Sequence, residues 1–227
     1  MDAIVQHIFG DIPLVTKIWT IGCLIESIMI KAGAMDRMKL LYSFDLVFKK
    51  GQFERIIFSL FDYGDFAISS LVNLYFSTLQ LSDLENSFNN IRRYLWVTFL
   101  MTLMIIYMTI FTPPVYSLGT ILHDNLTYYQ LQKNGNRLNL QLLGGINISP
   151  MLIPLYTNMI MYFAYDKSLA QVTMMFLPGH IVYYTDCVLS KLYDIDLLKT
   201  PYDWWQLVHT TTETTRVDNT TGETEND

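Results

Sequence analysis

The clearest pattern along this sequence is a series of long segments without a charged side chain. Residues 94–122 contain no Asp, Glu, Lys or Arg over 29 positions, residues 138–165 contain none over 28, and residues 168–185 contain none over 18. Apolar runs in soluble cores are usually only about 8–15 residues long, because water is close to every part of a globular core. The pattern therefore indicates a membrane protein.

The apolar stretches between polar or Pro/Gly breaks predict six membrane-spanning helices. They lie near residues 14–31, 58–81, 94–112, 115–132, 149–165 and 171–192. Pro113-Pro114 separates the third helix from the fourth, because proline inside a helix removes a hydrogen bond and clashes with the preceding turn. The predicted fold class is an all-α membrane protein, a bundle of six helices with both termini on one side.

Two other segments complete the predicted organisation. Residues 32–57 mix apolar side chains with lysines, which is typical of an amphipathic loop at a membrane interface. Residues 206–227 consist mostly of Thr, Glu, Asp and Asn, and so few apolar side chains cannot stabilise an ordered structure. We therefore expect a membrane domain over residues 1–205 and a disordered acidic tail over residues 206–227.

Composition excludes two further classes of protein. Of the 227 residues, 51% are hydrophobic and 16% are charged, and the formal net charge of −6 provides no basic surface for nucleic acid. The two cysteines, Cys23 and Cys187, are far apart and both lie in apolar segments. They predict neither a disulfide framework nor a metal site, and we expect no cofactor.

The basic residues indicate an orientation in the membrane. Most basic residues of the later loops lie on the side that carries both termini, which favours cytosolic termini. These residues are Arg92, Arg93, Lys133, Arg137, Lys191 and Lys199. The first loop is also basic and would then face away from the cytosol, which is compatible with the rule only if that loop is an interfacial structure.

Ionisable side chains occur inside the predicted helices, where each charge costs about 2.5 kcal/mol or more. They are Glu26, His123, Asp124, His180 and Asp186. Catalysis is one explanation, because an intramembrane serine hydrolase pairs a serine with a histidine from another helix. His180 could be that histidine, but Ser117 lacks the preceding glycine of a G-x-S motif. The catalytic alternative, an active intramembrane serine protease, would need Ser117 or Thr120 as an unusual nucleophile.

His123 and Asp124 allow a second explanation for polar groups at membrane depth. Adjacent helical residues point about 100° apart, so this pair cannot bind one metal ion together. The two side chains could instead face the bundle interior or line a hydrated cavity. Such a cavity could accept polar polypeptide at membrane depth.

Several short motifs, in order along the chain, resemble those of one known family. Residues 11–19 (DIPLVTKIW) resemble its I-P-x-x-T-[KR]-x-W start, and residues 73–76 (NLYF) followed by Leu84-Glu85 resemble the end of its second helix. Residues 144–154 (GGINISPMLIP), 179–184 (GHIVYY) and 198–201 (LKTP) resemble three later motifs. From residue 10 to residue 205 the chain resembles the derlins, inactive relatives of the rhomboid proteases. It is most similar to the fungal branch associated with the degradation of luminal endoplasmic reticulum proteins.

This resemblance implies a non-enzymatic function. A derlin of the endoplasmic reticulum membrane receives misfolded luminal proteins and assists their retrotranslocation across a thinned membrane to a ubiquitin ligase. The implied partners are a membrane ubiquitin ligase complex with its adaptor, misfolded luminal substrates and the lipid bilayer. Residues 206–227 lack the glycine- and arginine-containing motif with which several derlins recruit an AAA ATPase, so we expect no direct ATPase binding by the tail.

The candidate site residues either contact substrate along its path or hold the bundle together. They are Gly51, Gln52 and Arg55 in the first loop, His123, Asp124 and Asn125 in the fourth helix, and Gly179, His180, Tyr183 and Asp186 in the sixth. In the first loop the family has a tryptophan-arginine pair, whereas this chain has Glu54-Arg55. The role of Arg55 carries over by resemblance, and that of the tryptophan does not.

Overall fold

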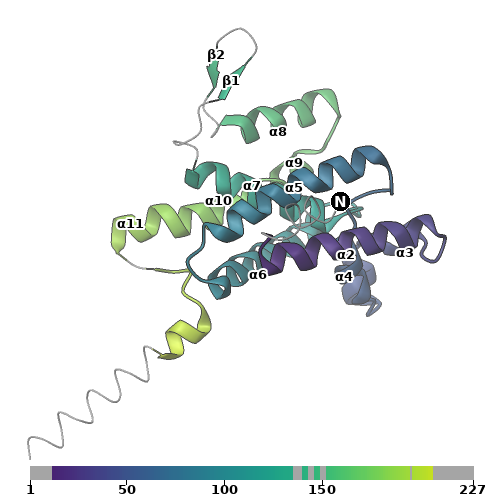
Figure 1. The fold of residues 1–227 in the computed structure, drawn as a ribbon, viewed down its shortest axis with the longest axis horizontal. Helices are drawn as coiled ribbons and strands as arrows, with labels where there is room; N and C mark the ends of the chain where they lie inside the picture. The colour runs from purple at the N-terminus through teal and green to yellow at the C-terminus, as the bar shows by residue number, and fades with distance from the viewer. Residues whose placement is uncertain (1–11, 135–139, 143–145, 149–151, 195, 207–227) are drawn as a thin grey trace, which may run out of the picture.

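The computed structural model describes residues 12–134, 140–142, 146–148, 152–194 and 196–206 (Figure 1). Its first part contains α2 (Leu14–Lys31), α3 (Arg37–Leu40), the π-helical turn η1 (Asp45–Lys49), α4 (Glu54–Phe61), α5 (Ile68–Asn86) and α6 (Ile91–Met108), which the 3-10 turn η2 (Thr109–Phe111) extends. Its second part contains α7 (Leu118–Asn134), β1 (Leu140–Leu142), β2 (Ile146–Ile148), α8 (Ile153–Ala164), α9 (Leu169–Met174), α10 (Leu177–Tyr183), the π-helical turn η5 (Tyr184–Leu189) and α11 (Ser190–Tyr193). The described chain is therefore mostly helical, as predicted.

A small antiparallel hairpin, β1–β2, pairs Leu140 with Ile148. Figure 1 shows it projecting from the helices beside α8. It follows α7 and precedes α8, within a stretch for which the sequence predicted no strand.

The predicted helix over residues 58–81 is wrong, because the chain leaves the helical conformation between α4 and α5. The Asp62 side chain accepts a hydrogen bond from the N–H of Gly64 at 3.0 Å, which is a local turn contact that competes with the helix. Gly64 has a φ of +110°, a conformation that favours glycine. As a result, α4 is a separate short helix before α5, and α5 begins only at Ile68.

The predicted helix over residues 171–192 is also interrupted. It divides into α9 and α10 at Met175 and Phe176, and Pro178 stands in the first turn of α10, where its missing N–H costs nothing. Further along, η5 inserts a π-helical turn before α11. The first, third and fourth predicted helices correspond to α2, to α6 with η2, and to α7.

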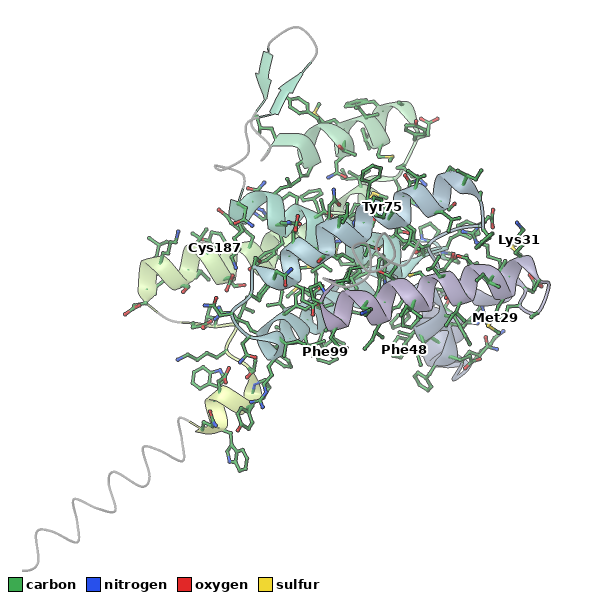
Figure 2. All side chains as sticks on the ribbon, in the orientation of Figure 1. Met29, Lys31, Phe48, Tyr75, Phe99 and Cys187 are labelled. Atoms are coloured by element: carbon green, nitrogen blue, oxygen red, sulfur yellow. The ribbon has the colours of Figure 1, made fainter. Side chains whose placement is uncertain are left out.

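Within the described ranges, one helix is long and apolar enough to cross a membrane by length and composition, Ile91–Phe111. Only 28% of its most apolar stretch is buried inside the bundle, so its apolar surface largely faces outward. Phe99, which is 51% exposed, lies at the edge of the structure in Figure 2. A soluble core helix would be mostly buried, and this helix is not.

Helix α2 has its polar side toward the protein. Its buried residues are Thr16, Thr20, Cys23, Glu26 and Ser27. Its exposed residues include Leu14, Ile18, Ile21, Ile25 and Ile28. A surface helix of a soluble protein shows the opposite arrangement. The outward aliphatic face of α2 is suited to lipid.

Helix α7 lies at the centre of the bundle and packs against α4, α5, α6 and α10. Two glycines allow backbone-to-backbone contact with it. A Cβ atom added at Gly119 would lie 2.3 Å from the Leu60 carbonyl oxygen, and one at Gly179 would lie 2.5 Å from the Asn125 carbonyl oxygen. Since neither backbone oxygen can move independently of its helix, both crossings require glycine.

Candidate functional site

A cavity of about 250 Å³ lies between α7 and α8. Helix α7 contributes His123, Asp124 and Thr127 to its wall, and α8 contributes Thr157 and Asn158. The remaining lining side chains are mostly apolar and include Leu131, Met161 and Met175. The cavity therefore combines hydrogen-bonding groups with flexible apolar side chains, a combination that can adapt to ligands of varied shape.

His123 and Asp124 both reach this cavity. His123 Nδ1 lies 3.7 Å from Asp124 Oδ1, and the Tyr63 ring meets the imidazole edge-on at 6.2 Å. His123 Nε2 is buried and has no hydrogen-bond partner among the described residues, whereas the Asp124 side chain is 42% exposed. Of this pair, the exposed Asp124 carboxylate is therefore the group that can accept a hydrogen bond from the cavity.

Asn125 does not line the cavity, because it faces α9 and α10 instead. It is fully buried, and its Nδ2 donates to the Ile121 carbonyl at 2.8 Å and to the Met174 carbonyl at 3.0 Å. Its Oδ1 accepts from the N–H of Gly179 at 2.9 Å. Asn125 therefore satisfies two backbone groups that the break between α9 and α10 leaves without a helical partner.

His180 is paired with Tyr128: its Nδ1 lies 2.8 Å from the tyrosine hydroxyl. Ser117 lies eleven residues before Tyr128, about 16 Å along the axis of α7 at about 1.5 Å per residue. The Ser117 hydroxyl donates to the Asp62 carbonyl and accepts from the N–H of Thr120. Ser117 therefore starts α7 as a cap, and no serine–histidine pair with His180 forms.

Asp186 forms the centre of a charged cluster at the end of α7 opposite Ser117. Its carboxylate accepts from Arg93 Nη2 at 2.6 Å, from the Tyr129 hydroxyl at 2.6 Å and from Lys133 Nζ at 3.4 Å. Arg93 also pairs with Asp196 at 2.8 Å. The side chain of Asp186 is only 5% exposed. We call these five residues the Asp186 cluster.

The cluster connects α6, α7, η5 and the chain after α11. From the sequence, Arg93 and Lys133 are loop charges and Asp186 is an ionisable residue inside the sixth predicted helix, with nothing to connect them. The feature of the sequence that could have indicated the cluster is the spacing of Tyr129 and Lys133. They are four residues apart and therefore share one face of α7. Tyr183, one turn before Asp186, packs against the apolar core.

The three candidate residues of the first loop stabilise the loop itself. Gly51 has a φ of +71°, Arg55 Nε donates to Gln52 Oε1 at 2.6 Å, and Arg55 Nη1 donates to the Leu41 carbonyl at 2.8 Å. Tyr42, which follows Leu41 in the chain, exchanges two backbone hydrogen bonds of 3.0 Å with Val115. Arg55 thus supports the contact of the first loop with the turn between α6 and α7.

Tyr42 is fully buried in this contact. Burial raises the pKa of its phenol, although the hydrogen bond from Thr109 opposes the shift.

Glu54 stands where the family has a tryptophan. It occupies the first turn of α4, where a negative charge interacts favourably with the helix dipole. Phe53 is 57% exposed, and its ring contacts Phe48 edge-on.

A long-range contact between α5 and α2 was not predicted from the sequence. The Glu85 carboxylate, at the end of α5, accepts from the N–H of Val15 at 3.1 Å and from the N–H of Thr16 at 2.8 Å. Glu85 therefore caps α2 from a position 69 residues later in the sequence. Both partners lie in motifs that resemble those of the derlins, residues 11–19 and Leu84-Glu85. The Glu26 carboxylate is buried, and neither of its oxygens has a hydrogen-bond partner in the described structure.

The described ranges contain no group of three or more His, Cys, Asp or Glu side chains that could hold a metal ion.

Comparison with known proteins gives a consistent set of similarities. A sequence model of the Der1-like family matches residues 12–202. The chain is 48% identical over 210 residues to "Degradation in the endoplasmic reticulum protein 1" of Saccharomyces cerevisiae, a match that covers 92% of this chain and 100% of the yeast protein. It is 25% identical over 201 residues to "Probable derlin-2 homolog" of Dictyostelium discoideum, covering 85% of this chain and 78% of that protein.

Proposed function

Because the chain belongs to the Der1-like family, we propose that it is a non-catalytic component of endoplasmic-reticulum-associated degradation that assists misfolded luminal proteins across the membrane. The name of the yeast relative supports the process and the compartment. The observation that supports the mechanism is the cavity between α7 and α8, which is mainly apolar but contains polar side chains on both walls. The confirmed family membership agrees with the resemblance predicted from the sequence motifs.

The cavity lowers the cost of placing polypeptide at membrane depth. A backbone N–H or C=O without a hydrogen-bond partner in hydrocarbon costs several kcal/mol, so an extended chain cannot cross lipid unaided. Asp124 on one wall and Asn158 on the other offer partners to such groups, and His123 and Thr157 add to the polar lining. The methionines on the same walls accommodate apolar side chains of differing shape.

The short helix beside the cavity favours a thin membrane. Helix α8 has 12 residues and is about 18 Å long, whereas the hydrocarbon core of a bilayer is about 30 Å thick. A bilayer adapts to short apolar elements by thinning locally, which shortens the path for a crossing polypeptide.

The proposed topology has six spans with both termini in the cytosol. The spans are α2, α5, α6 with η2, α7, α8, and the series from α9 to α11. The first loop, residues 32–67, then rests at the luminal surface together with the turn between α6 and α7. The Asp186 cluster lies at the opposite, cytosolic end. Residues 1–205 form the membrane domain, and the acidic tail over residues 206–227 lies outside the described residues apart from Gln206.

The proposed partners follow from the family. They are a membrane ubiquitin ligase complex with its adaptor and misfolded luminal substrates, and the tail does not recruit an AAA ATPase directly. The outward faces of α2 and α8 are apolar and open to lipid or to such a partner.

The protease alternative is disfavoured by the position of the histidine. His180 binds Tyr128, about three turns of α7 away from Ser117 and about two turns from Thr120. Cleavage of a model transmembrane substrate by the purified protein, abolished by His180→Ala, would establish protease activity and overturn the proposal.

Site-specific photocrosslinking tests the proposed path. A photoreactive residue placed at Thr127 or Asn158, inside the cavity, should crosslink to a misfolded luminal glycoprotein during its degradation. The same residue at Ile21 or Ile25, on the outward face of α2, is the matched control and should give lipid or weak protein adducts. Equal crosslinking at all four positions, or none at the cavity in a folded and abundant protein, would contradict the proposal.

A further inference from the structure

After α11, the chain returns to the bundle and presents a short aromatic helix. Leu198 and Thr200 are buried, and Arg93 binds both carboxylate oxygens of Asp196 at 2.8 and 3.1 Å. The helix covers residues 201–206. Thr200 Oγ1 donates to Asp203 Oδ2 at 2.7 Å and accepts from the N–H of Asp203 at 3.2 Å, which fixes the first turn. We call residues 196–206 the C-terminal segment.

The contacts of this segment set its depth relative to the membrane. Arg92 and Arg93 are the second and third residues of Ile91–Phe111, the helix that is long and apolar enough to span a bilayer. Arg93 holds Asp196, and the Arg92 guanidinium lies 4.4 Å from the centre of the Tyr202 ring. The C-terminal segment is therefore level with the first turn of a membrane span, where hydrocarbon gives way to lipid headgroups.

The exposed side chains of the segment match this depth. Tyr202 is 44% exposed, Trp204 is 50% and Trp205 is 60%. Figure 2 shows the aromatic side chains of this last helix projecting away from the bundle. Tyrosine and tryptophan concentrate at the boundary between lipid and water, because one end of each ring system is apolar and the other forms hydrogen bonds.

Two cations accompany these rings. Lys199 Nζ lies 5.9 Å from the centre of the Trp204 ring, and Arg92 lies over Tyr202. Lysine and arginine extend their charged ends from an apolar surface toward water and the phosphates of lipids. Both cations are on the side of the protein that we place in the cytosol, where the leaflet carries anionic lipids.

We propose that the C-terminal segment is an interfacial anchor, with the rings of Trp204 and Trp205 in the headgroup layer at the start of α6 and with Lys199 and Arg92 on the phosphates of anionic lipids. The partner is the lipid surface. The anchor fixes the depth of α6 in the membrane through the bonds between Arg93 and Asp196. This role is independent of the path of any substrate, so its test needs only the protein and lipid.

Tryptophan fluorescence of the full chain in vesicles tests the anchor. The fluorescence that is lost in the double variant Trp204→Phe and Trp205→Phe, relative to the unaltered protein, comes from the C-terminal segment. The fluorescence that is lost in Trp96→Phe, within α6, is the matched control. Phospholipids brominated near the headgroup should quench the first signal at least two-fold more than phospholipids brominated near the chain end. The order should reverse, or the difference vanish, for Trp96. Circular dichroism checks that each variant is folded.

Each other outcome overturns the proposal. Quenching by aqueous iodide and not by brominated lipid would place the rings in water, and quenching by neither would place them against a protein partner or a second copy.

A second comparison tests the contact of the two cations with anionic lipid. Brominated phosphatidylserine should quench the tryptophan fluorescence more than brominated phosphatidylcholine at equal mole fraction, and Lys199→Gln should reduce the difference. Equal quenching by the two lipids in the unaltered protein would refute the anionic contact.

Discussion

At the scale of single residues, neighbours in the sequence divide between two roles. Asp124 opens onto the cavity, whereas Asn125 is fully buried and bonds to the backbone on both sides of a helix break. The change of direction follows from the angle of about 100° between successive helical residues. The position of a residue within a polar run therefore does not reveal its role.

Leucine substitutions separate these roles. Asn125→Leu leaves the Met174 carbonyl and the Gly179 N–H without partners, and each buried unpaired group costs about 1–3 kcal/mol. We expect lower abundance in cells and a lower melting temperature in detergent. Asp124→Leu, the matched variant, should keep normal abundance and melting temperature but slow the degradation of a luminal substrate. Lost abundance in both variants would mean that Asp124 is also structural.

The two glycine contacts predict an order of sensitivity. In Gly179→Ala the new Cβ would lie 2.5 Å from the Asn125 carbonyl oxygen, so α7 and α10 must separate. In Gly22→Ala the Cβ meets only the Phe61 ring, also at 2.5 Å, which can rotate away. Thermal unfolding should show a clearly larger loss for Gly179→Ala, in the range of about 1–3 kcal/mol for overpacking. Equal losses would mean that the Phe61 ring cannot move.

At the scale of elements, the last helical series is held by charges rather than by a continuous helix. It is broken between α9 and α10 and contains the π-helical turn η5. The Asp186 cluster binds this turn to α6 and α7. The turn η5 interrupts the regular helix at the residue that forms the centre of the cluster, and π-helical turns often occur at functional sites.

A double-mutant cycle measures this coupling. Removing one partner of a fully buried ion pair costs about 3–5 kcal/mol, because the other charge remains buried. Arg93 is 34% exposed, and without it Asp186 still pairs with Lys133, so we expect a smaller loss here. Asp186→Asn and Arg93→Gln should therefore each destabilise the protein, and the double variant should lose less than the sum. Asp45→Asn and Lys49→Gln, which form an exposed pair at 2.7 Å, are the control and should change the free energy of unfolding by under about 1 kcal/mol. Strict additivity at Arg93 and Asp186 would show that the pair is uncoupled.

At the scale of the whole molecule, the two ends of the bundle differ in kind. One end carries the first loop and its contact with the turn between α6 and α7, and the other carries the Asp186 cluster and the C-terminal segment. The proposed topology places the first end in the lumen. Its basic residues then lie in a folded interfacial loop, which explains why they do not follow the charge rule for short loops.

Glycosylation tests this topology. The sequon at Asn219 should stay unmodified, because the tail is cytosolic in the proposed topology. A sequon on a flexible spacer inserted at Gly51, in the first loop, should be glycosylated. Mass spectrometry and endoglycosidase shifts measure both. Modification of Asn219 would reverse the orientation, and the proposed roles of the two ends would exchange.

The sequence alone determined the membrane character, the helical class and the family. Uncharged runs such as residues 94–122 are a local property, and the motifs around Thr16 and Gly179 keep their order without reference to the fold. The sequence also revealed the break at Pro113-Pro114, because proline acts on the residues next to it. Each of these features depends on neighbours in the chain.

Only the tertiary structure decided which polar residues work together. Glu85 caps α2 across 69 positions, Asn125 bonds to Met174 across 49, and Arg93 pairs with Asp186 across 93. No periodicity encodes such pairs, because a hydrogen bond requires two groups within about 3 Å and the packing of helices sets that distance. The same holds for the turn after α4, where Asp62 and Gly64 end a helix that apolar pattern alone would continue.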